Sequence, residues 1–293
     1  MAVNPARIEA LVVAHDSAKR LPACLAALAL EGVPALVVDN ASRDGSAEVA
    51  ERLGARVLRL PRNEGYGRAN NLGARTSGAE FLLIANPDIV LDPGTTAALL
   101  AAAARYPDAG LLAPRLLEGE TRLFFQSRSL LSAVLPNPKG VPCRPDGDVC
   151  APFLSGACFL IRRDLFLSVG GFDEKIFLFY EDDDLCRRLL DAGRAPVHVH
   201  HGTARHGRGL SSAPAPGRVF RSRWHQAWSR AYVASKYGLP GAAPGMLALN
   251  APKALLSLLS FRRSVIERYL GSAAGALAFL RGRTALGREG LDG

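Results

Sequence analysis

The sequence predicts an α/β fold in which a mostly parallel sheet is flanked by helices. Through the first part of the chain, short apolar runs rich in Val, Leu and Ile alternate with segments of helical periodicity. Continuous apolar runs of this kind are typical of strands buried on both faces, as in a parallel sheet covered by helices. Polar residues follow three of these runs, and ligands of such sheets bind at the carboxyl ends of the strands. The functional residues are therefore expected along one edge of the sheet.

The elements of the first half follow from these runs in order. Residues 8–15 (IEALVVAH) predict the first strand, because nearly all of them are apolar. Residues 21–30 (LPACLAALAL) predict a helix, because their apolar side chains recur at helical spacing. The same two patterns predict further strands at 35–40, 56–60 and 81–88 and further helices at 46–55 and 67–78.

The second half is less regular. Residues 115–150 are rich in Pro, Gly and Arg and are expected to form an irregular surface excursion. Residues 153–173 predict a strand, a short helix and a Gly-Gly turn, and an acidic cluster then opens a helix at 181–192. Residues 195–202 alternate like a strand and lead into an expected loop at 203–212.

The net charge of +9 lies at the end of the chain. Residues 218–293 hold 12 Lys/Arg and 3 acids, whereas residues 1–217 hold 24 of each sign. We therefore divide the chain into a neutral domain, 1–217, with halves 1–114 and 115–217, and a basic helical extension, 218–293. The extension predicts an anionic partner such as a membrane surface, while the neutral domain lacks the footprint of a nucleic-acid-binding protein, so no nucleic acid is expected. A solubilising helical surface is the plain alternative.

Composition and cysteine content narrow the class of protein. With 48% hydrophobic and 22% charged residues over 293 positions, the chain is expected to be globular and neither disordered nor collagen-like. Its five cysteines form no C-x-x-C pair, and their odd number fits neither a complete disulfide framework nor a zinc ribbon. The N-terminus shows no signal-peptide pattern before the first strand. We expect reduced thiols in a cytoplasmic protein.

Three strand ends and one helix start carry the candidate residues. A single carboxylate at a strand end often caps the following helix, but several that converge on one edge indicate a site. An acidic run at 181–184 begins a predicted helix. Helix capping and the helix dipole explain one or two of its carboxylates but not all four, so the others are candidates for a chemical role. The strand ends are His15-Asp16-Ser17, Asp39-Asn40 and Asn86-Pro87-Asp88.

Seven motifs stand in a definite order along the chain: VVAHDSAKRLPACLAAL (12–28), VVDNASRDGS (37–46), NEGYGRANNLGA (63–74), NPD (86–88), FLSGACFLIRR (153–163), GGFDEKIFLFYEDDDLCRRL (170–189) and HGRGLS (206–211). In this order and spacing the chain resembles family 2 glycosyltransferases, and within them the rhamnosyltransferase-like branch that builds bacterial polysaccharides and cell-wall glycans. The resemblance covers roughly residues 8–240. It implies a GT-A fold, a nucleotide-sugar donor, a divalent metal (Mg²⁺ or Mn²⁺) and an inverting displacement.

The resemblance implies a metal site at Asp88. Sugar transfer from a nucleoside diphosphate leaves a diphosphate, whose charge a metal held by hard ligands neutralises. The family's D-x-D is here Asn86-Pro87-Asp88, with one carboxylate, and His206 in HGRGLS matches the position at which a histidine completes the metal shell. The histidine cluster at 198–201 could instead bind zinc, but no cysteine or acid lies near it in the sequence, so it is the weaker alternative.

Asp39 matches the family position that hydrogen-bonds the pyrimidine base of the donor. A carboxylate accepts from the N3–H of uracil or thymine and is repelled by the N3 lone pair of cytosine, so dTDP- or UDP-sugars are expected rather than CMP-sugars. Glycine in the next motif allows the backbone to approach the donor closely. The other residues expected to bind the donor are His15, Asn63, Gly65, Asn70, Asn86 and Asp88.

The family pattern E-D-x-D-L makes Asp182 the general base that takes the proton of the attacking acceptor hydroxyl. Crowded carboxylates raise each other's pKa, which suits a base but leaves Asp183 or Glu181 as alternatives. Residues 155–157 (SGA) are expected to line the acceptor pocket.

The sequence thus predicts an inverting, metal-dependent glycosyltransferase that moves rhamnose from dTDP-rhamnose onto a lipid-linked or polysaccharide acceptor in bacterial cell-envelope glycan synthesis. A family member with a UDP-hexose donor and a catalytically idle sugar-nucleotide- or glycan-binding module are the alternatives. The apolar stretches 253–261 and 269–283 are too short to span a membrane. With their basic flanks they suit helices lying on the inner face of the plasma membrane, although packing on the domain or homodimerisation is equally compatible.

Overall fold

A ten-stranded mixed sheet forms the centre of the structure. The computed structural model describes residues 7–119, 121–125, 129, 131, 144–207, 216–239 and 241–291. Eight strands lie in the order β3-β2-β1-β4-β9-β6-β10-β5, while β7 pairs with β6 and β8 with β10. The strands are β1 Ile8–Ala14, β2 Ala35–Asp39, β3 Arg56–Arg59, β4 Phe81–Ala85, β5 Ile89–Leu91, β6 Leu111–Glu118, β7 Arg122–Phe124, β8 Val149–Cys150, β9 Cys158–Arg162 and β10 Pro196–His206.

Strand direction confirms the mixed, mostly parallel sheet. β1 is parallel to both of its neighbours, β2 and β4, and β3 continues this set. β9 is antiparallel to β4 and β6, so β6 and its parallel partner β10 point the same way as β1. The last strand in the order, β5, is antiparallel to β10. The carboxyl ends of six strands therefore meet along one edge of the sheet.

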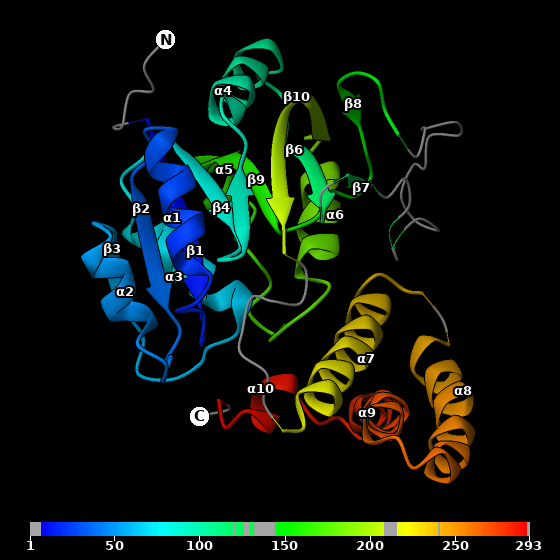
Figure 1. Cartoon of the computed structure of the whole chain (residues 1–293). Helices are drawn as coiled ribbons and strands as arrows, with labels where there is room; N and C mark the ends of the chain where they lie inside the picture. The colour runs from blue at the N-terminus through cyan, green and yellow to red at the C-terminus, as the bar shows by residue number, and fades with distance from the viewer. Residues whose placement is uncertain are drawn as a thin grey trace.

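Helices cover both faces of the sheet (Figure 1). Alternate residues of β1 enter opposite cores because side chains alternate along a strand. Val12 packs in the core with α1, α2 and α4, whereas Leu11 packs in the core with α3, α5 and α6. These helices are α1 Leu21–Leu30, α2 Ser46–Arg52, α3 Tyr66–Thr76, α4 Thr95–Arg105, α5 Arg163–Ser168 and α6 Glu181–Asp191.

The structure confirms the alternation of strands and helices in the first half and corrects two segments of the second. The expected irregular excursion at 115–150 begins instead within β6, which lies inside the sheet between β9 and β10 and forms a hairpin with β7. Much of the rest of that segment lies outside the described residues. The expected loop at 203–212 is wrong at its start, because β10 continues to His206. β10 is extended because it pairs with β6 on one side and with β5 on the other. No local sequence pattern predicts these pairings.

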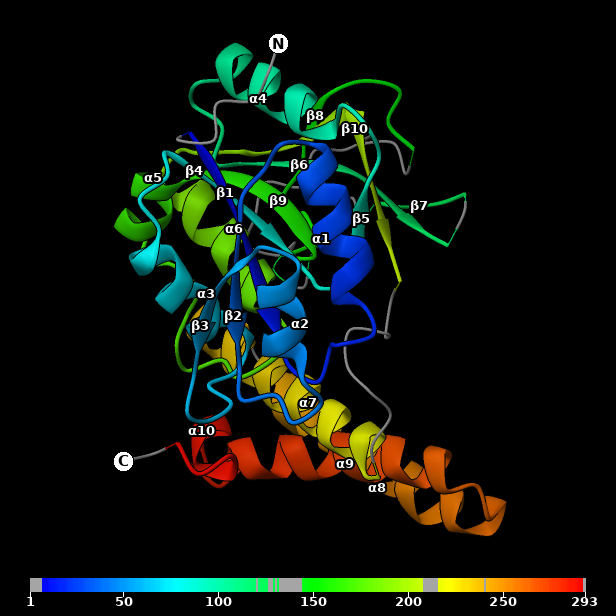
Figure 2. The ribbon, with the colours of Figure 1, turned by 60° about the vertical axis from the view of Figure 1, so that its left-hand side comes forward.

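Four α-helices form the C-terminal part as far as the structure describes it, and Figure 2 shows them on one side of the sheet domain. In Figure 1 they lie beyond the edge toward which β2 and β10 point. Aromatic side chains of α7 share a hydrophobic core with Phe177, which precedes residue 217. The two parts are therefore packed together, and the domain boundary at residue 217 stays a prediction. The elements are α7 Arg218–Lys236, α8 Ala242–Ser257, the 3₁₀ turn Leu258–Ser260, α9 Arg263–Leu280 and α10 Ala285–Arg288.

Close helix packing holds α9 against α7. At Gly271, a Cβ atom would come 2.5 Å from the carbonyl oxygen of Phe220, so the backbones approach to a distance that only glycine permits. In the part of the chain that the structure describes, one segment, Ala242–Ser260, is long and apolar enough to cross a membrane on length and composition alone. The stretch 253–261, predicted to be too short to span, overlaps the second half of this segment, whose helix already begins at Ala242.

Candidate active site

The strand ends that carry the polar motifs lie side by side. In the register of the sheet, Ala14 is opposite Asp39, and Val12 is opposite Ala85. His15, Asp39 and Asn86 therefore leave neighbouring strands at the same edge, as the sequence predicts. β1, β2 and β4 bring these residues together because parallel strands in register end together.

Asn40 ties the motif at 63–74, which is predicted to bind the donor, to the end of β2. Its side-chain amide donates to Asn63 Oδ1 at 3.0 Å and to the Gly65 carbonyl at 3.2 Å, and its Oδ1 accepts from the Glu64 backbone N–H at 2.8 Å. On the other side, its backbone carbonyl oxygen lies 2.9 Å from His15 Nδ1. A buried amide whose contacts are all satisfied holds the loop firmly, so Asn40 positions residues 63–65, a role that its place at a strand end does not predict.

The adjacent Asp39 differs from Asn40 because one of its carboxylate oxygens has no partner among the described residues. Its side chain is buried, with 5% of the residue exposed, and Oδ1 makes no hydrogen bond within the described part of the protein. A buried carboxylate oxygen without a donor is costly, so such an atom is expected to meet a ligand donor. The prediction that Asp39 binds the N3–H of a pyrimidine base fits this geometry.

Gly65 is required by both its conformation and its surroundings. Its φ is +85°, and a Cβ would lie 2.5 Å from the Phe177 carbonyl oxygen, which also accepts from the Tyr66 N–H at 3.0 Å. Asn63 Oδ1 accepts from the Gly65 N–H at 3.0 Å, so Asn63 shapes this turn. Asn70 is fully buried, and its amide donates to the Tyr66 carbonyl at 3.0 Å while its Oδ1 lacks a partner among the described residues.

Asp88 and His206 meet through the pairing of β5 with β10. His206 stands opposite Ile89 in this antiparallel pair, and its Nε2 lies 3.4 Å from Asp88 Oδ1. The remainder of the HGRGLS motif, from residue 208, lies outside the described residues. One carboxylate and one imidazole suit Mn²⁺ or Mg²⁺ when a diphosphate supplies further oxygens, so the donor set fits the predicted metal. Among the described residues no group of three or more His, Cys, Asp or Glu side chains is arranged to hold a metal ion.

The histidine cluster on β10 has a different environment. His198 is buried with its ring 5.3 Å from that of Phe125, and burial lowers its pKa to about 4. His200 and His201 lie with ring centroids 5.3 Å apart. Aromatic packing accounts for His198, and the zinc alternative finds no set of three ligands in the described segments.

Asp182 is held by the loop that the sequence assigned to the acceptor pocket. Its Oδ2 accepts from the Gly156 N–H at 2.9 Å, and a Cβ at Gly156 would lie 3.1 Å from the Asp182 Cβ. The same loop contacts two of the motifs predicted to bind the donor: the Gly156 carbonyl accepts from the Tyr66 hydroxyl at 2.8 Å, and the Ala157 carbonyl accepts from the Asn86 N–H at 2.9 Å. One short loop therefore joins the predicted base to the NPD motif.

The environment of Asp182 suits a group that must take up a proton. Burial raises the pKa of its carboxyl, against the lowering effect of the backbone N–H donors. Burial, with the charge of Asp182, raises the pKa of the neighbouring Glu181 to about 8, so that residue is largely protonated at neutral pH. Burial and these two carboxyls also raise the pKa of Tyr66 well above its usual range, which keeps its hydroxyl a hydrogen-bond donor. Tyr66 lies in the 63–74 motif, but no local pattern in the sequence marks it as a site residue.

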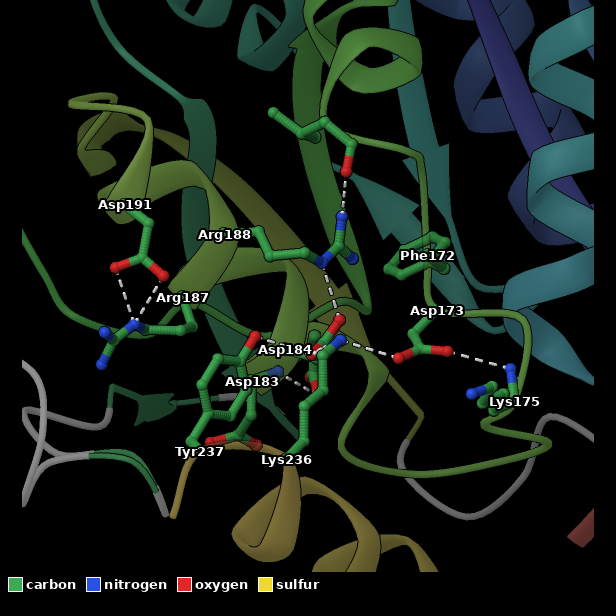
Figure 3. Close-up of polar contacts among 12 residues, drawn as sticks. Phe172, Asp173, Lys175, Asp183, Asp184, Arg187, Arg188, Asp191, Lys236 and Tyr237 are labelled. Carbon is green, nitrogen blue, oxygen red and sulfur yellow. Dashed lines mark hydrogen bonds and ion pairs between the residues drawn. The ribbon is translucent and has the colours of Figure 1, made fainter. Parts of the chain in front are cut away.

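Asp184 has a structural role in the same acidic run. It is fully buried, and its carboxylate contacts Arg188 at 2.8 Å, Lys236 at 2.6 Å and the Tyr237 hydroxyl at 2.8 Å (Figure 3). Lys236 also contacts Asp173 at 2.7 Å, so the end of α7 is clamped to the start of α6. Two cations neutralise Asp184, which leaves Asp182 as the member of the run that faces the Gly156 loop. No local pattern in the sequence predicts that Lys236 pairs with Asp184.

Comparisons with known proteins agree with this architecture. The glycosyl transferase family 2 model matches residues 10–170. The chain is 31% identical over 287 residues to a Mycobacterium tuberculosis protein named N-acetylglucosaminyl-diphospho-decaprenol L-rhamnosyltransferase, covering 87% of this chain and 93% of that one. It is 30% identical over 192 residues to the rhamnosyltransferase WbbL of Escherichia coli K12, covering 59% of this chain and 71% of the relative.

Solved structures add evidence on the fold. The mannosyltransferase PcManGT from Pyrobaculum calidifontis, in complex with GDP-Man and Mn²⁺, has a TM-score of 0.57 at 17% identity and covers 94% of this chain and 87% of its own. GalNAc-T7 with UDP, GalNAc and Mn²⁺ has a TM-score of 0.60 at 15% identity and covers 79% of this chain and 48% of its own. The sheet and its flanking helices thus form the predicted GT-A fold. The match to the family model and the relative that is similar over nearly its whole length together show that the chain belongs to glycosyl transferase family 2.

Proposed function

We propose that this glycosyltransferase moves L-rhamnose from dTDP-rhamnose, with inversion, onto a lipid-linked acceptor in the synthesis of a cell-envelope glycan. The observation that carries the proposal is the bridge made by one loop, in which Gly156 holds Asp182 and Ala157 holds Asn86, two residues from Asp88. This bridge keeps a candidate base and a candidate diphosphate site at one edge of the sheet. The similarity to a protein named as an L-rhamnosyltransferase acting on a decaprenol-linked acceptor supports the sugar and the acceptor class.

Asp39 and the loop that follows β3 would bind the nucleotide. The free Oδ1 of Asp39 would accept from N3–H of the thymine base, which is the donor that this buried atom lacks. Asn40 and Asn63 hold Gly65 at its positive φ of +85°, where the absence of a side chain lets the loop lie directly against the Phe177 carbonyl. This arrangement fixes the loop before the donor arrives, so little ordering is needed on binding.

Asp88 and His206 would hold the divalent cation. Mg²⁺ or Mn²⁺ bound there would neutralise the charge that develops on the leaving diphosphate. Both side chains are mostly buried, with 1% and 13% of their surface exposed, so their positions are defined by packing and by the β5–β10 pairing. Solved relatives of this fold contain Mn²⁺, which supports the choice of a divalent metal.

Asp182 would act as the base. As the acceptor oxygen bonds to the anomeric carbon, the bond from that carbon to the diphosphate oxygen breaks, and the acceptor proton passes to the Asp182 carboxylate. Each carboxylate oxygen already accepts one backbone N–H, from Gly156 and Asp183, and retains a second lone pair for that proton. Attack opposite the leaving group in a single displacement inverts the anomeric configuration.

Two other functions make different predictions. A family member with a UDP-hexose donor would use the same contact from Asp39, since uracil also carries N3–H. A binding module without catalysis would bind the donor and release no nucleotide, and the raised pKa of Asp182, which suits proton uptake, favours an enzyme instead.

The test is transfer by the purified full-length protein. It would be incubated with dTDP-rhamnose, Mg²⁺ or Mn²⁺ and a short-chain polyprenyl diphosphate carrying N-acetylglucosamine, and the product would be followed by mass spectrometry and NMR. We expect metal-dependent addition of one deoxyhexose with inverted anomeric configuration. Transfer from UDP-hexoses alone would identify the first alternative, and donor binding without transfer to any acceptor would identify the second.

A further inference from the structure

An apolar surface is exposed where α8 turns into α9. We call residues 255–261 the apolar elbow. Its large side chains are 55 to 93% exposed, with Phe261 at the upper limit, and Ser257 is its only buried residue. Phe261 also holds a left-handed backbone with φ of +51°, an unfavourable conformation for a bulky residue. The exposed side chains are Leu255, Leu256, Leu258, Leu259 and Phe261.

The elbow stands clear of the rest of the protein. Figure 2 shows the joined ends of α8 and α9 projecting away from the sheet domain, at the far end from α10. Leu249 on α8 and Leu270 on α9 are also about half exposed. Contiguous exposed apolar surface of this kind marks an interaction site in a soluble domain.

Basic side chains surround the apolar surface. Arg262 and Arg263 follow Phe261 directly, and Lys253 and Arg268 lie on the flanking helices, all of them exposed. The one nearby acid, Glu267, is paired with Arg263 at 2.7 Å. Exposed leucine and phenylalanine with adjacent cations match the interface of an anionic lipid leaflet, where acyl chains receive the apolar groups and headgroups receive the charges.

We propose that the apolar elbow inserts into an anionic membrane leaflet, with the α8–α9 hairpin lying along the surface. The inference rests on the proposed function only in that a lipid-linked acceptor would be met at this leaflet. The elbow also orients the enzyme. α9 is packed closely on α7 at Gly271, and Lys236 at the end of α7 is bound to Asp184 in the acidic run, so the inserted elbow and Asp182 belong to one connected framework.

Two other arrangements of this surface are less compatible with its charges. If α8 spanned the membrane, Lys253 would be drawn into the hydrocarbon, and α9, which packs beside α8, would bring Arg263, Glu267 and Arg268 with it. If a second copy covered the elbow about a twofold axis, the two basic rims would face each other and repel. An anionic surface satisfies both the apolar side chains and the cations.

The test uses full-length protein and vesicles without donor or acceptor, so that its failure is distinct from failure of the proposed transfer. Sedimentation would compare phosphatidylcholine vesicles with and without phosphatidylglycerol. We expect binding only with the anionic lipid. Leu259→Ser with Phe261→Ser, and separately Arg262→Gln with Arg263→Gln, should each lower the partition coefficient by about tenfold or more.

Matched controls exist elsewhere on the surface. Leu30 and Leu53 are also exposed leucines, and Lys19 and Arg52 are exposed cations, all in the sheet domain. Leu30→Ser with Leu53→Ser and Lys19→Gln with Arg52→Gln should leave binding unchanged. Because every substituted side chain faces solvent, all variants are expected to keep the wild-type thermal midpoint, which checks that they fold.

A second measurement reports depth. In Phe261→Trp, the new indole should be quenched by brominated phospholipid, while the native Trp224 and Trp228, each 4% exposed, give a constant background. Quenching, together with release of the protein at about 0.5 M salt, where the Debye length is a few ångströms, would support insertion at the surface. Equal binding by elbow and control variants, or absence of quenching, would overturn the proposal. So would retention in vesicles after alkaline extraction, which indicates a span, or a dimer that the serine variant dissociates.

Discussion

Replacing Asp182 by Asn tests the assignment of the base with a nearly isosteric change. Both carboxylate oxygens accept backbone hydrogen bonds, Oδ2 from Gly156 at 2.9 Å and Oδ1 from Asp183 at 3.1 Å. Asparagine offers one oxygen, so one of these N–H groups would face an NH₂ group instead. The expected loss of stability is about 0.5–1.5 kcal/mol, the net value of one hydrogen bond. The bond to Gly156 can be kept, and with it the position of the loop.

The effect on catalysis should be much larger than the effect on stability. The amide cannot accept the proton of the acceptor hydroxyl, and loss of a general base lowers kcat by about 10²- to 10⁴-fold. This corresponds to about 3–5 kcal/mol in the activation barrier. Because burial raises the pKa of Asp182, kcat/KM of the wild type should rise with pH through a value above the ordinary 4 or so of an aspartate, and the variant should lack that limb.

Asp184→Asn is the matched control two residues away. It removes the charge that neutralises Lys236 and Arg188, whose contacts with it are 2.6 and 2.8 Å. Breaking a buried ion pair costs about 3–5 kcal/mol, and we expect the lower part of this range because the two cations are partly exposed. Turnover per folded molecule should be retained, because the Asp184 carboxylate contacts Arg188, Lys236 and Tyr237 and not the Gly156 loop. The two variants therefore separate chemistry from stability.

The assay would combine three measurements on wild type, Asp182→Asn, Asp183→Asn and Asp184→Asn. Product formation gives kcat, calorimetry with the donor nucleotide gives affinity, and thermal unfolding gives stability. We expect Asp182→Asn to bind the nucleotide normally and to lose transfer. If Asp183→Asn is inactive while Asp182→Asn is active, the base has been assigned to the wrong carboxylate. If Asp184→Asn is as inactive as Asp182→Asn while still folded, the structural role given to Asp184 is wrong.

Three further predictions concern the donor, the metal and pH. Asp39→Ala should weaken dTDP binding by about 10- to 100-fold, the value of a hydrogen bond to a charged group. An unchanged affinity in calorimetry would show that Asp39 does not bind the thymine. His206→Ala should raise the Mn²⁺ concentration needed for half-maximal transfer by about tenfold or more, whereas an unchanged metal dependence would contradict its role. Because Glu181 has a pKa of about 8 in the folded state, above its unfolded value, the folded state retains the proton longer, and stability should fall as pH rises from about 4 to about 8. Glu181→Gln should flatten this dependence and raise the thermal midpoint at the upper end; parallel curves for the two proteins would refute the shift.

The C-terminal helices connect to the site more closely than charge alone indicates. The basic extension is distinguished in the sequence by its excess of Lys and Arg, which predicts a separate role for it. In the structure, His225 of α7 is fully buried, stacks on Phe177 with ring centroids 4.7 Å apart and contacts Glu289 at 2.8 Å. The Phe177 carbonyl in turn accepts from the Tyr66 N–H beside Gly65. Removing α8 to α10 would delete the elbow and would also disturb the loop at Gly65. Point variants are therefore the better test of the elbow.

The features that depend on neighbouring residues could be predicted from the sequence alone. Apolar runs defined the first strands, helical spacing defined α1, and the polar residues after β1, β2 and β4 were placed on one edge because parallel buried strands end together. The boundaries were less exact where the backbone changes conformation: the helix expected at 46–55 ends at Arg52, followed closely by Gly54 with φ of +82°.

The features that join distant segments could not be predicted and become visible only in the folded chain. The antiparallel pairing of β5 with β10 brings His206 to Asp88, and it extends a strand into residues whose composition favours a loop. Four consecutive acids look alike in the sequence, and it is Lys236 and Arg188 that give Asp184 a structural role while Gly156 engages Asp182. Local periodicity follows from the near neighbours of a residue, whereas these partners are selected by how helices and strands pack, and packing depends on the whole chain.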